Sequence, residues 1–493
     1  MEWNDTIVAL ATPAGAGAIG VIRVSGDATF DIVSKLLKTP IDAVRSHSVC
    51  LRELHDQEGL IDEALLTLFR GAKSYTGQPT IEIAIHGSDY ISQRLLKALL
   101  ESGARMAEPG EFTQRAFLNG KLDLAQAEAV ADIIASEHKF AHSQAMNQLR
   151  GGFSNDIRDL REKLLHFTAL IELELDFGEE DVEFASRADL TRLVTDIQSR
   201  VNELRDSFSL GNALKKGFAL VLAGRPNAGK STLFNAFLNE DKAIVSDIAG
   251  TTRDAIEDFV HFGDLKVRLV DTAGIREATD VIEREGIHRT FRHVEASGAT
   301  LYVMDAASIS LEELRTDLEL LSSKTKRLWL VANKADLVSG DGKLADLKQV
   351  AEEVLGGESS AREVAEMRVS SVNDSGVEVQ PEGSGKVEFV FETVVAKDRE
   401  SVRKLVGVLS GIFQEQLSQF QGQTVVTNAR HAQALEICSE ELTLILNGIS
   451  QGLTGDLLSF HLRSGIAALA AITGEIDNEE VLGHIFSKFC IGK

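Results

Sequence analysis

The feature that most constrains this chain is the segment 224–231, Gly-Arg-Pro-Asn-Ala-Gly-Lys-Ser, which matches the pattern GxxxxGK[ST]. An apolar run at 218–222 precedes it, and a helical pattern at 232–238 follows it. In this strand–loop–helix context, glycines let backbone N–H groups surround phosphate oxygens, the Lys230 ammonium neutralises them, and the Ser231 hydroxyl can ligate Mg²⁺. The segment therefore predicts a phosphate-binding loop in an α/β domain.

Two further motifs each come directly after an apolar run. The sequence Asp-Thr-Ala-Gly begins at Asp271, and Asn-Lys-Ala-Asp begins at Asn333. Asp271 can hold Mg²⁺ through water, and the N–H of Gly274 can sense a γ-phosphate. The Asp336 carboxylate can accept the N1–H and 2-amino hydrogens of guanine, which adenine does not offer as a pair, so ATP would leave it unpaired. Together the three motifs predict an enzyme that binds and hydrolyses GTP.

The segment 246–254, Ser-Asp-Ile-Ala-Gly-Thr-Thr-Arg-Asp, predicts a switch loop. We expect Thr252 to ligate Mg²⁺ while the γ-phosphate is present and to release it afterwards. Regulatory GTPases commonly carry a water-orienting glutamine directly after the DxxG glycine, but this chain has the apolar Ile275 there. Another side chain must orient the water, and the candidates are Arg276, Glu277, Glu283 and Glu285. The sequence assigns no arginine finger.

The loop that stacks on the base has two candidate positions. One is Ser370-Ser371-Val372, and the other is Val395-Ala396-Lys397. We favour the second, because it follows the alternating strand pattern of 387–391 and leads into the helical pattern of 401–413.

Apolar patterning divides the chain into regions. Residues 1–118 contain strand-like runs at 19–24 and 80–85 and a helical stretch at 91–100, which indicates mixed α/β structure. An amphipathic helix is predicted in the proline-free region that follows, from the stripe Ile157, Leu160, Leu164, Phe167 and Ile171, and another near the C-terminus, from Leu458, Leu462, Ile466 and Leu469.

Between these helical regions lie four short apolar runs, at 218–222, 266–270, 301–304 and 328–331. Such runs suit strands that are buried on both faces of a mostly parallel sheet. An α/β domain is therefore expected to be inserted into a helical one, so the two helical segments must meet in space. Residues 339–386 contain two glycine-rich stretches that are loop-like by composition, and we expect an insertion there whose order the sequence leaves open.

Composition limits the compartment and the partners. The chain has 44% hydrophobic and 26% charged residues, as in a soluble globular protein, and its three cysteines are widely spaced, which is typical of free thiols in the cytoplasm. It lacks an apolar run of the about 18–20 residues that cross a membrane. The net charge of −24 argues against autonomous nucleic-acid binding, because phosphate neutralisation supplies most of that affinity. An RNA substrate would instead be held by a partner.

Several stretches along nearly the whole chain resemble the MnmE (TrmE) family of tRNA-modification GTPases. The matching residues are 5–9, 12–13, 20–26, the run 108–124 (Glu-Pro-Gly-Glu-Phe-Thr-Gln-Arg-Ala-Phe-Leu-Asn-Gly-Lys-Leu-Asp-Leu), 249–254 and the terminal Cys-Ile-Gly-Lys. The resemblance implies a multidomain α/β plus α fold: an N-terminal α/β domain (1–118) that binds folate and dimerises, a helical domain (119–214 and 421–493), and an inserted Ras-like P-loop G domain (215–420).

The resemblance also implies the metal sites and the catalytic residues. Ser231 and Thr252 would ligate Mg²⁺, and Glu283 would orient the attacking water, with Lys230 as the second catalytic residue. The K⁺ ligands would be Asn227, Ser246, Ile248 and Thr251. This K⁺ ion would offset the charge that builds between the β- and γ-phosphates when two G domains meet. The full set expected to contact GTP is Asn227, Ala228, Gly229, Lys230, Ser231, Thr232, Ser246, Asp247, Ile248, Ala249, Gly250, Thr251, Thr252, Asp271, Thr272, Ala273, Gly274, Asn333, Lys334 and Asp336.

For the folate site, the resemblance implies that formyl- or methylene-tetrahydrofolate contacts Arg23, Glu82, Lys121 and Lys493. A carboxylate suits the N–H pair of a pterin, and cations suit the glutamate tail. The chain departs from the family pattern in having Ser88 after His-Gly and Gln-Pro after Gly77. Cys490 is either a nucleophile or a thiol that packs near the pocket.

The implied reaction adds a carboxymethylaminomethyl-type group to C5 of the wobble uridine, position 34, of certain tRNAs. The implied assembly is a homodimer that joins an FAD-containing MnmG (GidA)-like flavoprotein in a heterotetramer, with tRNA bound mainly by that partner and no membrane involved. The alternative is a regulatory GTPase switch in ribosome assembly or stress response. A pure switch needs neither the 109–124 run nor the C-terminal tail.

Overall fold

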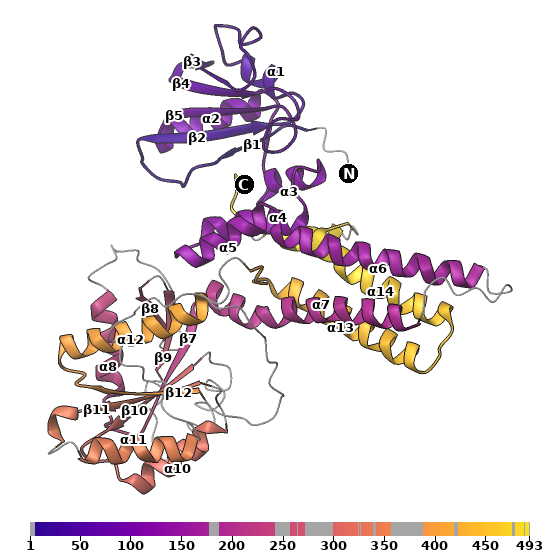
Figure 1. Ribbon diagram of the computed structural model, residues 1–493. Coiled ribbons are helices and arrows are strands. Elements are labelled where there is room, and N and C mark those ends of the chain that lie inside the picture. Colours follow the sequence, from indigo (N-terminus) through magenta and orange to yellow (C-terminus); the bar gives the residue numbers. More distant parts are fainter. Residues whose placement is uncertain are drawn as a thin grey trace, which may run out of the picture. The chain divides into compact units, whose positions relative to one another are not determined.

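The computed structural model describes residues 5–176, 187–241, 257–263, 265–271, 299–323, 325, 327–338, 342–355, 388–418, 423–475, 479–487 and 489–492 (Figure 1). The chain forms two compact units. The first comprises Met1–Ser136, Ala141–Phe208 and Thr424–Lys493, and the second comprises Glu137–Phe140 and Ser209–Gln423. Within the described ranges, every helix is too short or too polar to cross a membrane.

The first unit begins with a six-stranded sheet in the order β3-β4-β5-β2-β1-β6. Its elements are β1 (Ile7–Leu10), β2 (Ile19–Ser25), α1 (Thr29–Ser34), β3 (Ser48–Asp56), β4 (Gly59–Phe69), β5 (Thr80–His86), α2 (Asp89–Glu101) and β6 (Arg105–Met106). The strands predicted at 19–24 and 80–85 and the helix at 91–100 are confirmed as β2, β5 and α2.

Side chains alternate between the two faces of this sheet, as the period of a strand requires. Ile81, Ile83 and Ile85 of β5 are buried in one core with residues of α1 and α2. Glu82 of β5 has the opposite parity, and in the antiparallel register with β2 it pairs with Arg23. The predicted folate residues Arg23 and Glu82 therefore lie on the face of the sheet opposite α1 and α2.

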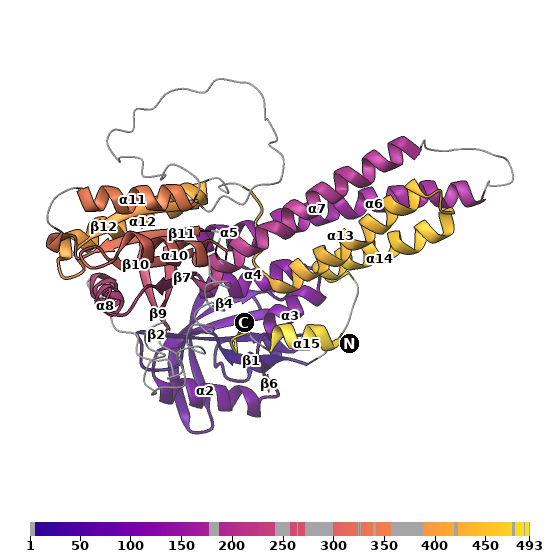
Figure 2. The same ribbon diagram turned by 90° about the horizontal axis from the view of Figure 1, so that it is seen from below.

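The rest of the first unit is helical (Figure 2). It contains α3 (Glu111–Leu118), α4 (Leu124–Ala135), most of α5 (Lys139–Leu149), α6 (Gly152–Asp176), α7 (Arg187–Lys216, which continues into the second unit), α13 (Ala429–Ser450), α14 (Gly455–Thr473) and α15 (Glu479–Phe486). The predicted apolar stripe on α6 is confirmed, since each of its five side chains is almost fully buried: Ile157, Leu160, Leu164, Phe167 and Ile171.

Helices from both ends of the chain share this helical core. Ile157 and Phe167 of α6 belong to one buried cluster with Leu442 of α13 and Leu462 of α14. Figures 1 and 2 show α13 and α14 running beside α6 and α7. The expectation that the two helical segments meet across an insertion is thus confirmed.

The second unit has a six-stranded sheet in the order β12-β11-β10-β7-β9-β8. Its elements are β7 (Phe218–Ala223), α8 (Lys230–Asp241), β8 (Glu257–Phe262), β9 (Leu265–Asp271), β10 (Ala299–Asp305), α10 (Leu311–Ser322), β11 (Arg327–Asn333), the short 3₁₀ helix η2 (Ala335–Leu337), α11 (Gly342–Leu355), β12 (Glu388–Val394) and α12 (Arg399–Ser418). All pairs are parallel except β8 with β9, and β7, β10 and β11 are buried along nearly their whole length. The four predicted buried strands and their mostly parallel pairing are confirmed.

The first part of the expected insertion has regular structure. Residues 342–355 form the helix α11. Its side chains Leu347, Val350, Ala351 and Leu355 are buried in a core shared with α10 and the sheet. The signal for this helix in the sequence is the apolar spacing of three and four residues, which stands next to the glycines after 355. The remainder of the predicted insertion, from 356, lies outside the described residues.

Candidate functional site

The phosphate loop joins the carboxyl end of β7 to the first turn of α8. Two of its glycines are required by their surroundings. Gly224 has φ +143°, and a Cβ there would lie 2.1 Å from the carbonyl oxygen of Val303 in β10. Gly229 has φ +97°, and a Cβ there would lie 2.1 Å from Nδ2 of Asn333. The motif glycines therefore let the loop lie directly against the ends of β10 and β11.

Lys230 lies at the start of α8 and is 8% exposed. Its Nζ donates to the carbonyl oxygens of Gly224 at 2.8 Å and of Arg225 at 2.9 Å. The next two residues, Ser231 and Thr232, are exposed in the first helical turn. The helix N-terminus adds backbone N–H groups and the positive end of the helix dipole. A held ammonium, exposed hydroxyls and a helix N-terminus together suit an anion such as a phosphate.

Asn333, the last residue of β11, links the phosphate loop to the end of β12. Its Nδ2 donates to the carbonyl oxygen of Ala228 at 2.8 Å, and its Oδ1 accepts from the N–H of Ala396 at 3.0 Å. The side chain is buried, at 2% exposure, and both ends of its amide are satisfied. Asn333 therefore brings together three segments that are far apart in the sequence.

Lys334 lies on the other side of the same loop. It adopts a left-handed conformation with φ +59°, and its Nζ donates to Asn227 O at 3.0 Å and to Asp305 Oδ2 at 2.7 Å. Burial would raise the pKa of Asp305, but hydrogen bonds from Lys334, Ser308 and the N–H of Ala307, with the charge of Lys334, together hold the pKa below its usual value. Asp305 was not singled out in the sequence, because only its position at the end of β10 brings it here.

Asp336 and the segment 395–397 lie at the same edge of the sheet. Asp336 is exposed within η2, and within the described residues no hydrogen bond or ion pair occupies its carboxylate. Val395-Ala396-Lys397 follows β12, and the N–H of Ala396 reaches Asn333. The favoured base-loop position is thus next to the motif that would select guanine. The alternative at Ser370 lies outside the described residues.

Other predicted site residues are only partly covered. Asp271 ends β9 and is paired in register with Leu222 of β7, one residue before the end of that strand. The switch residues Ser246, Asp247, Ile248, Ala249, Gly250, Thr251 and Thr252, the motif residues Thr272, Ala273 and Gly274, the water-orienting candidates Arg276, Glu277, Glu283 and Glu285, and the terminal Lys493 all lie outside the described residues.

In the first unit, Arg23 and Glu82 are in contact with each other. Arg23 Nε donates to Glu82 Oε1 at 3.0 Å, and Nη2 lies 2.8 Å from the same oxygen. The guanidinium also lies 5.2 Å from the ring centre of Tyr75 and 5.5 Å from that of Phe112. Both side chains are only partly exposed, at 14% and 30%. The result is a carboxylate and a cation beside two aromatic rings, a combination that suits a polar heterocycle.

The chain's C-terminal tail reaches this same place. Arg23 Nη1 donates to the carbonyl oxygen of Gly492 at 3.3 Å. Gly492 has φ +96°, and a Cβ there would lie 2.5 Å from Leu10 O, so glycine is needed for the close approach. The carbonyl of Cys490 accepts from the N–H of Gly110 at 3.4 Å, while the cysteine itself is exposed. The tail is therefore packed on the N-terminal sheet.

Lys121 lies near the loop 71–79 instead of in direct contact with the Arg23–Glu82 pair. Its Nζ donates to Ala72 O at 3.1 Å. A Cβ at Gly77 would lie 3.4 Å from Lys121 Cγ and 2.8 Å from Asn119 Cβ, so the two segments are packed together. Three of the predicted folate residues, Arg23, Glu82 and Lys121, thus lie in one region, where Tyr75 of the same loop lies beside Arg23.

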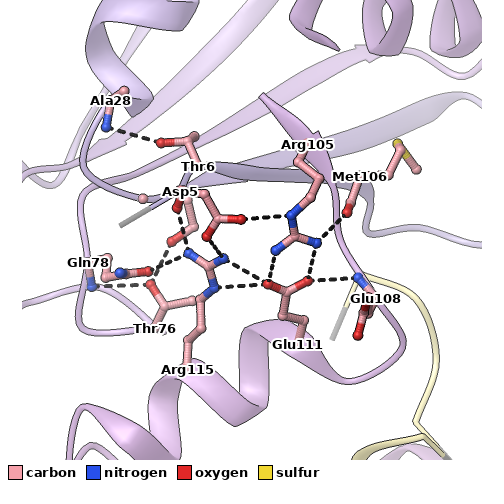
Figure 3. A network of polar contacts seen from close by, with 12 residues as sticks. Asp5, Thr6, Ala28, Thr76, Gln78, Arg105, Met106, Glu108, Glu111 and Arg115 are labelled. Carbon is pink, nitrogen blue, oxygen red and sulfur yellow. Dashed lines mark hydrogen bonds and ion pairs between the residues drawn. The ribbon is translucent and has the colours of Figure 1, made fainter. Parts of the chain in front are cut away.

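The 108–124 run is held by an ion-pair network that sequence reasoning missed (Figure 3). Arg115 and Glu111 are each 1% exposed and 2.8 Å apart, and Glu111 also pairs with Arg105 at 2.6 Å. Asp5 pairs with Arg105 at 2.7 Å and with Arg115 at 2.6 Å. Glu111 and Arg115 have the i, i+4 helical spacing, which was the available signal, but Asp5 and Arg105 carried none.

Both carboxylates of this network are held in their charged form. Burial would raise the pKa of Glu111, but the hydrogen bond from Arg105, the N–H of Glu108 and the Arg115 guanidinium lower it below its usual value. Burial acts the same way on Asp5, and hydrogen bonds from Arg105 and Arg115 again lower its pKa. The network therefore fixes the start of α3 against β1 and β6 and has the character of a structural brace.

Comparison with known proteins supports one family for the whole chain. Residues 6–121 match the family model described as the GTP-binding protein TrmE N-terminus, and residues 124–490 match that of the MnmE helical domain. The chain is 44% identical over 504 residues to the tRNA modification GTPase MnmE of Christiangramia forsetii, covering 100% of both proteins. It is also 44% identical to that of Cytophaga hutchinsonii, over 99% of this chain and 98% of the relative.

A third relative, the tRNA modification GTPase MnmE of Bacteroides fragilis, is 42% identical over 99% of this chain and 100% of its own length. A phosphate loop at the carboxyl edge of a mostly parallel sheet, the Asn-Lys-Ala-Asp motif beside it and full-length identity above 40% agree with one another. This chain belongs to the MnmE (TrmE) family of tRNA modification GTPases.

Proposed function

We propose that this GTPase hydrolyses GTP in a K⁺-dependent homodimer and uses a one-carbon tetrahydrofolate to modify C5 of uridine 34 in certain tRNAs. An FAD-containing, MnmG-like flavoprotein would be its partner and carry most of the tRNA contact, which agrees with the chain's net charge of −24. The observation that carries the proposal is the joining of Lys230, Asn333, Lys334 and Asp305 around one phosphate loop.

Lys230 would bind the β- and γ-phosphate oxygens, because its ammonium is already held over the loop by two carbonyls. The exposed Ser231 hydroxyl, with Thr252, would hold Mg²⁺, and Asp271 lies at the strand end expected for its water-mediated contact. Mg²⁺ would neutralise phosphate charge when bound. Asp336 would accept the guanine N–H pair, with 395–397 covering the base.

For K⁺, the fit rests on Asn227. It has φ +62° and is exposed, and its own carbonyl is taken by Lys334. Its side-chain oxygen would be a ligand of the K⁺ ion, together with oxygen atoms of Ser246, Ile248 and Thr251. Bound K⁺ would offset charge between the β- and γ-phosphates, and Glu283 would orient the water. Together these two would replace the missing glutamine and arginine finger.

The Arg23–Glu82 pair supports the folate part of the proposal. Glu82 would accept the N–H pair of the pterin, the rings of Tyr75 and Phe112 would line its face, and Lys121 with Lys493 would meet the glutamate tail. For Cys490 the two alternatives are a nucleophile and a thiol that packs near the pocket. The domains proposed are 1–118 for folate and dimerisation, 119–214 with 421–493 for the helical domain, and 215–420 for the G domain.

Apolar side chains on the sheet face opposite α1 and α2 support the homodimer. Val49 and Leu51 of the edge strand β3 are 58% and 51% exposed, and Leu65 of β4, paired with Leu51, is 48% exposed. Ile19 at the start of β2 adds a fourth exposed apolar side chain, at 65%. An exposed apolar patch of this kind suits coverage by a second copy.

GTP turnover in KCl and in NaCl tests the hydrolytic part. We expect a rate several-fold higher in K⁺, and Glu283→Ala should lower kcat about 100-fold or more while nucleotide binding stays within about twofold. Glu285→Ala, two residues away, is the control and should keep most of the activity. Equal rates in the two salts would contradict the K⁺ site, and full activity of Glu283→Ala would contradict its role.

Mass spectrometry of tRNA nucleosides from a deletion strain tests the modification. Loss of the C5 substituent at position 34, restored by the wild-type gene but not by a Glu82→Gln variant, is the expected result. Unmodified nucleosides in equal amounts with and without the gene would instead support a regulatory switch in ribosome assembly or stress response.

A further inference from the structure

Arg225, the second residue of the phosphate loop, is tied to a helix outside the nucleotide motifs. Its Nε donates to Asp317 Oδ2 at 2.7 Å, and its Nη2 donates to Asp317 Oδ1 at 3.1 Å, so the pair is bidentate. Nη1 bonds the carboxylate of Glu313, and Nη2 also donates to the Glu313 carbonyl at 3.4 Å. Both acidic residues lie on α10, one turn apart. The hydrogen bond to Asp317 is the largest cause that raises the pKa of Arg225.

The two carboxylates on α10 are themselves held in place. The hydroxyl of Tyr302, which is 2% exposed in β10, donates to Asp317. Glu313 belongs to the capping box of α10: its Oε2 accepts from the N–H of Ser310 at 3.0 Å, and its own N–H donates to Ser310 Oγ at 3.2 Å. The guanidinium of Arg225 therefore meets a pre-arranged acidic clamp, and its bidentate geometry specifies both position and orientation.

The backbone of Arg225 connects this clamp to Lys230. The Arg225 carbonyl accepts from Lys230 Nζ at 2.9 Å, beside the Gly224 carbonyl at 2.8 Å. Gly224 is already pressed against Val303 of β10, where a Cβ would lie 2.1 Å from the carbonyl oxygen. The first turn of the loop is thus held by β10 through Gly224 and by α10 through Arg225. A displacement of about 1 Å in such supporting groups is enough to impair catalysis.

We propose that Arg225 is a positioning residue for GTP hydrolysis: clamped by Asp317 and Glu313 of α10, it fixes the carbonyl that holds the Lys230 ammonium ready for the γ-phosphate. Arg225 acts through Lys230 and touches no reacting atom. Because Lys230 serves the β- and γ-oxygens, loss of the clamp should affect a triphosphate more than a diphosphate.

The test compares Arg225→Gln, Asp317→Asn and the double variant in the full-length protein. Steady-state turnover gives kcat and KM, and fluorescent GDP and a non-hydrolysable GTP analogue give the two Kd values. We expect kcat to fall about tenfold and the Kd of the GTP analogue to rise about fivefold, with the Kd of GDP within about twofold. The double variant should be no worse than either single one, because the two side chains act as a unit.

The matched control is Arg315→Gln. Arg315 also lies on α10 and pairs with Glu353 of α11 at 2.6 Å, but these side chains, 44% and 47% exposed, belong to neither the loop nor the clamp. It should behave as wild type. Thermal unfolding of the nucleotide-free proteins is measured alongside. The proposal is overturned if Arg225→Gln turns over GTP at the rate of Arg315→Gln. It is also overturned if the affinities for GDP and for the GTP analogue fall by the same factor while the Tm drops. A third contradicting result is a double variant whose loss of kcat is the sum, in free energy, of the two single losses.

Discussion

Replacing Glu128 by glutamine should destabilise the helical part of the first unit by about 3 kcal/mol at neutral pH, from the loss of a buried ion pair. Glu128 lies on α4 and is 8% exposed. Its carboxylate accepts from Arg430 Nε at 3.1 Å and Nη2 at 3.0 Å, and it lies 2.7 Å from His431 Nε2. Both partners are on α13, so the cluster joins the helical segment before the inserted unit to the segment after it.

The magnitude comes from the pKa of the carboxyl. Burial would raise the pKa of Glu128, but the nearby His431 and the Arg430 guanidinium lower it from 4.5 to about 2. A shift of that size corresponds to about 3 kcal/mol, at about 1.4 kcal/mol per pKa unit. Removing one partner of a buried pair costs a similar amount, about 3–5 kcal/mol. Glutamine keeps the shape of the side chain, so the loss would report the charge and its hydrogen bonds.

The sign of the pH dependence follows from the lowered pKa. A carboxyl whose folded pKa lies below its unfolded value contributes stability that is fully present above the unfolded pKa and is lost as the pH falls towards the folded pKa. The difference in unfolding free energy between wild type and Glu128→Gln should therefore be constant from about pH 7 to pH 5.5 and shrink between about pH 4.5 and pH 2.

Hydrogen exchange followed by mass spectrometry in increasing urea suits this prediction, because it reports α4 and α13 separately from the second unit. Glu203→Gln is the control, since Glu203 is 59% exposed and pairs with Arg200 on its own helix α7. Its effect should stay below about 0.5 kcal/mol, as for other surface pairs. A loss under about 1 kcal/mol for Glu128→Gln, or a difference that is unchanged from pH 5 to pH 3, would refute the reasoning.

Three further substitutions have defined outcomes. Gly229→Ala places a Cβ 2.1 Å from Asn333 Nδ2 at φ +97°. It should weaken GTP and GDP binding at least about 30-fold by calorimetry, because about 2 kcal/mol of strain or more falls on the loop. Asp336→Asn should weaken GTP at least about 100-fold and improve xanthosine triphosphate, whose 2-oxo group accepts from an amide; unchanged base preference in a competition assay would argue against the guanine assignment. Gly492→Ala places a Cβ 2.5 Å from Leu10 O. It should weaken tetrahydrofolate binding in equilibrium dialysis and leave GTP turnover unaltered, so a parallel loss of both would mean general misfolding.

Much of the nucleotide-binding unit was predictable from the sequence, because its signals are local. Buried strands appear as short apolar runs, and the phosphate loop needs glycine at Gly224 and Gly229 within eight consecutive residues. One apolar stripe predicted helix α6, and the side chains of this stripe are almost completely buried in the structure. Helix α11 was missed because glycines and polar residues surround it, and its apolar spacing is decisive only against the core that it covers.

The sequence by itself determined which segments carry chemistry and in which order they follow their strands. Only the tertiary structure decided which side chains meet. Asn333 reaches Ala228 across 105 positions and Ala396 across 63, and Arg225 reaches Asp317 across 92. The physical reason is that local periodicity reflects the geometry of one helix or strand, whereas these contacts depend on strand register and on the packing of elements in the folded chain, which involve residues far apart along it.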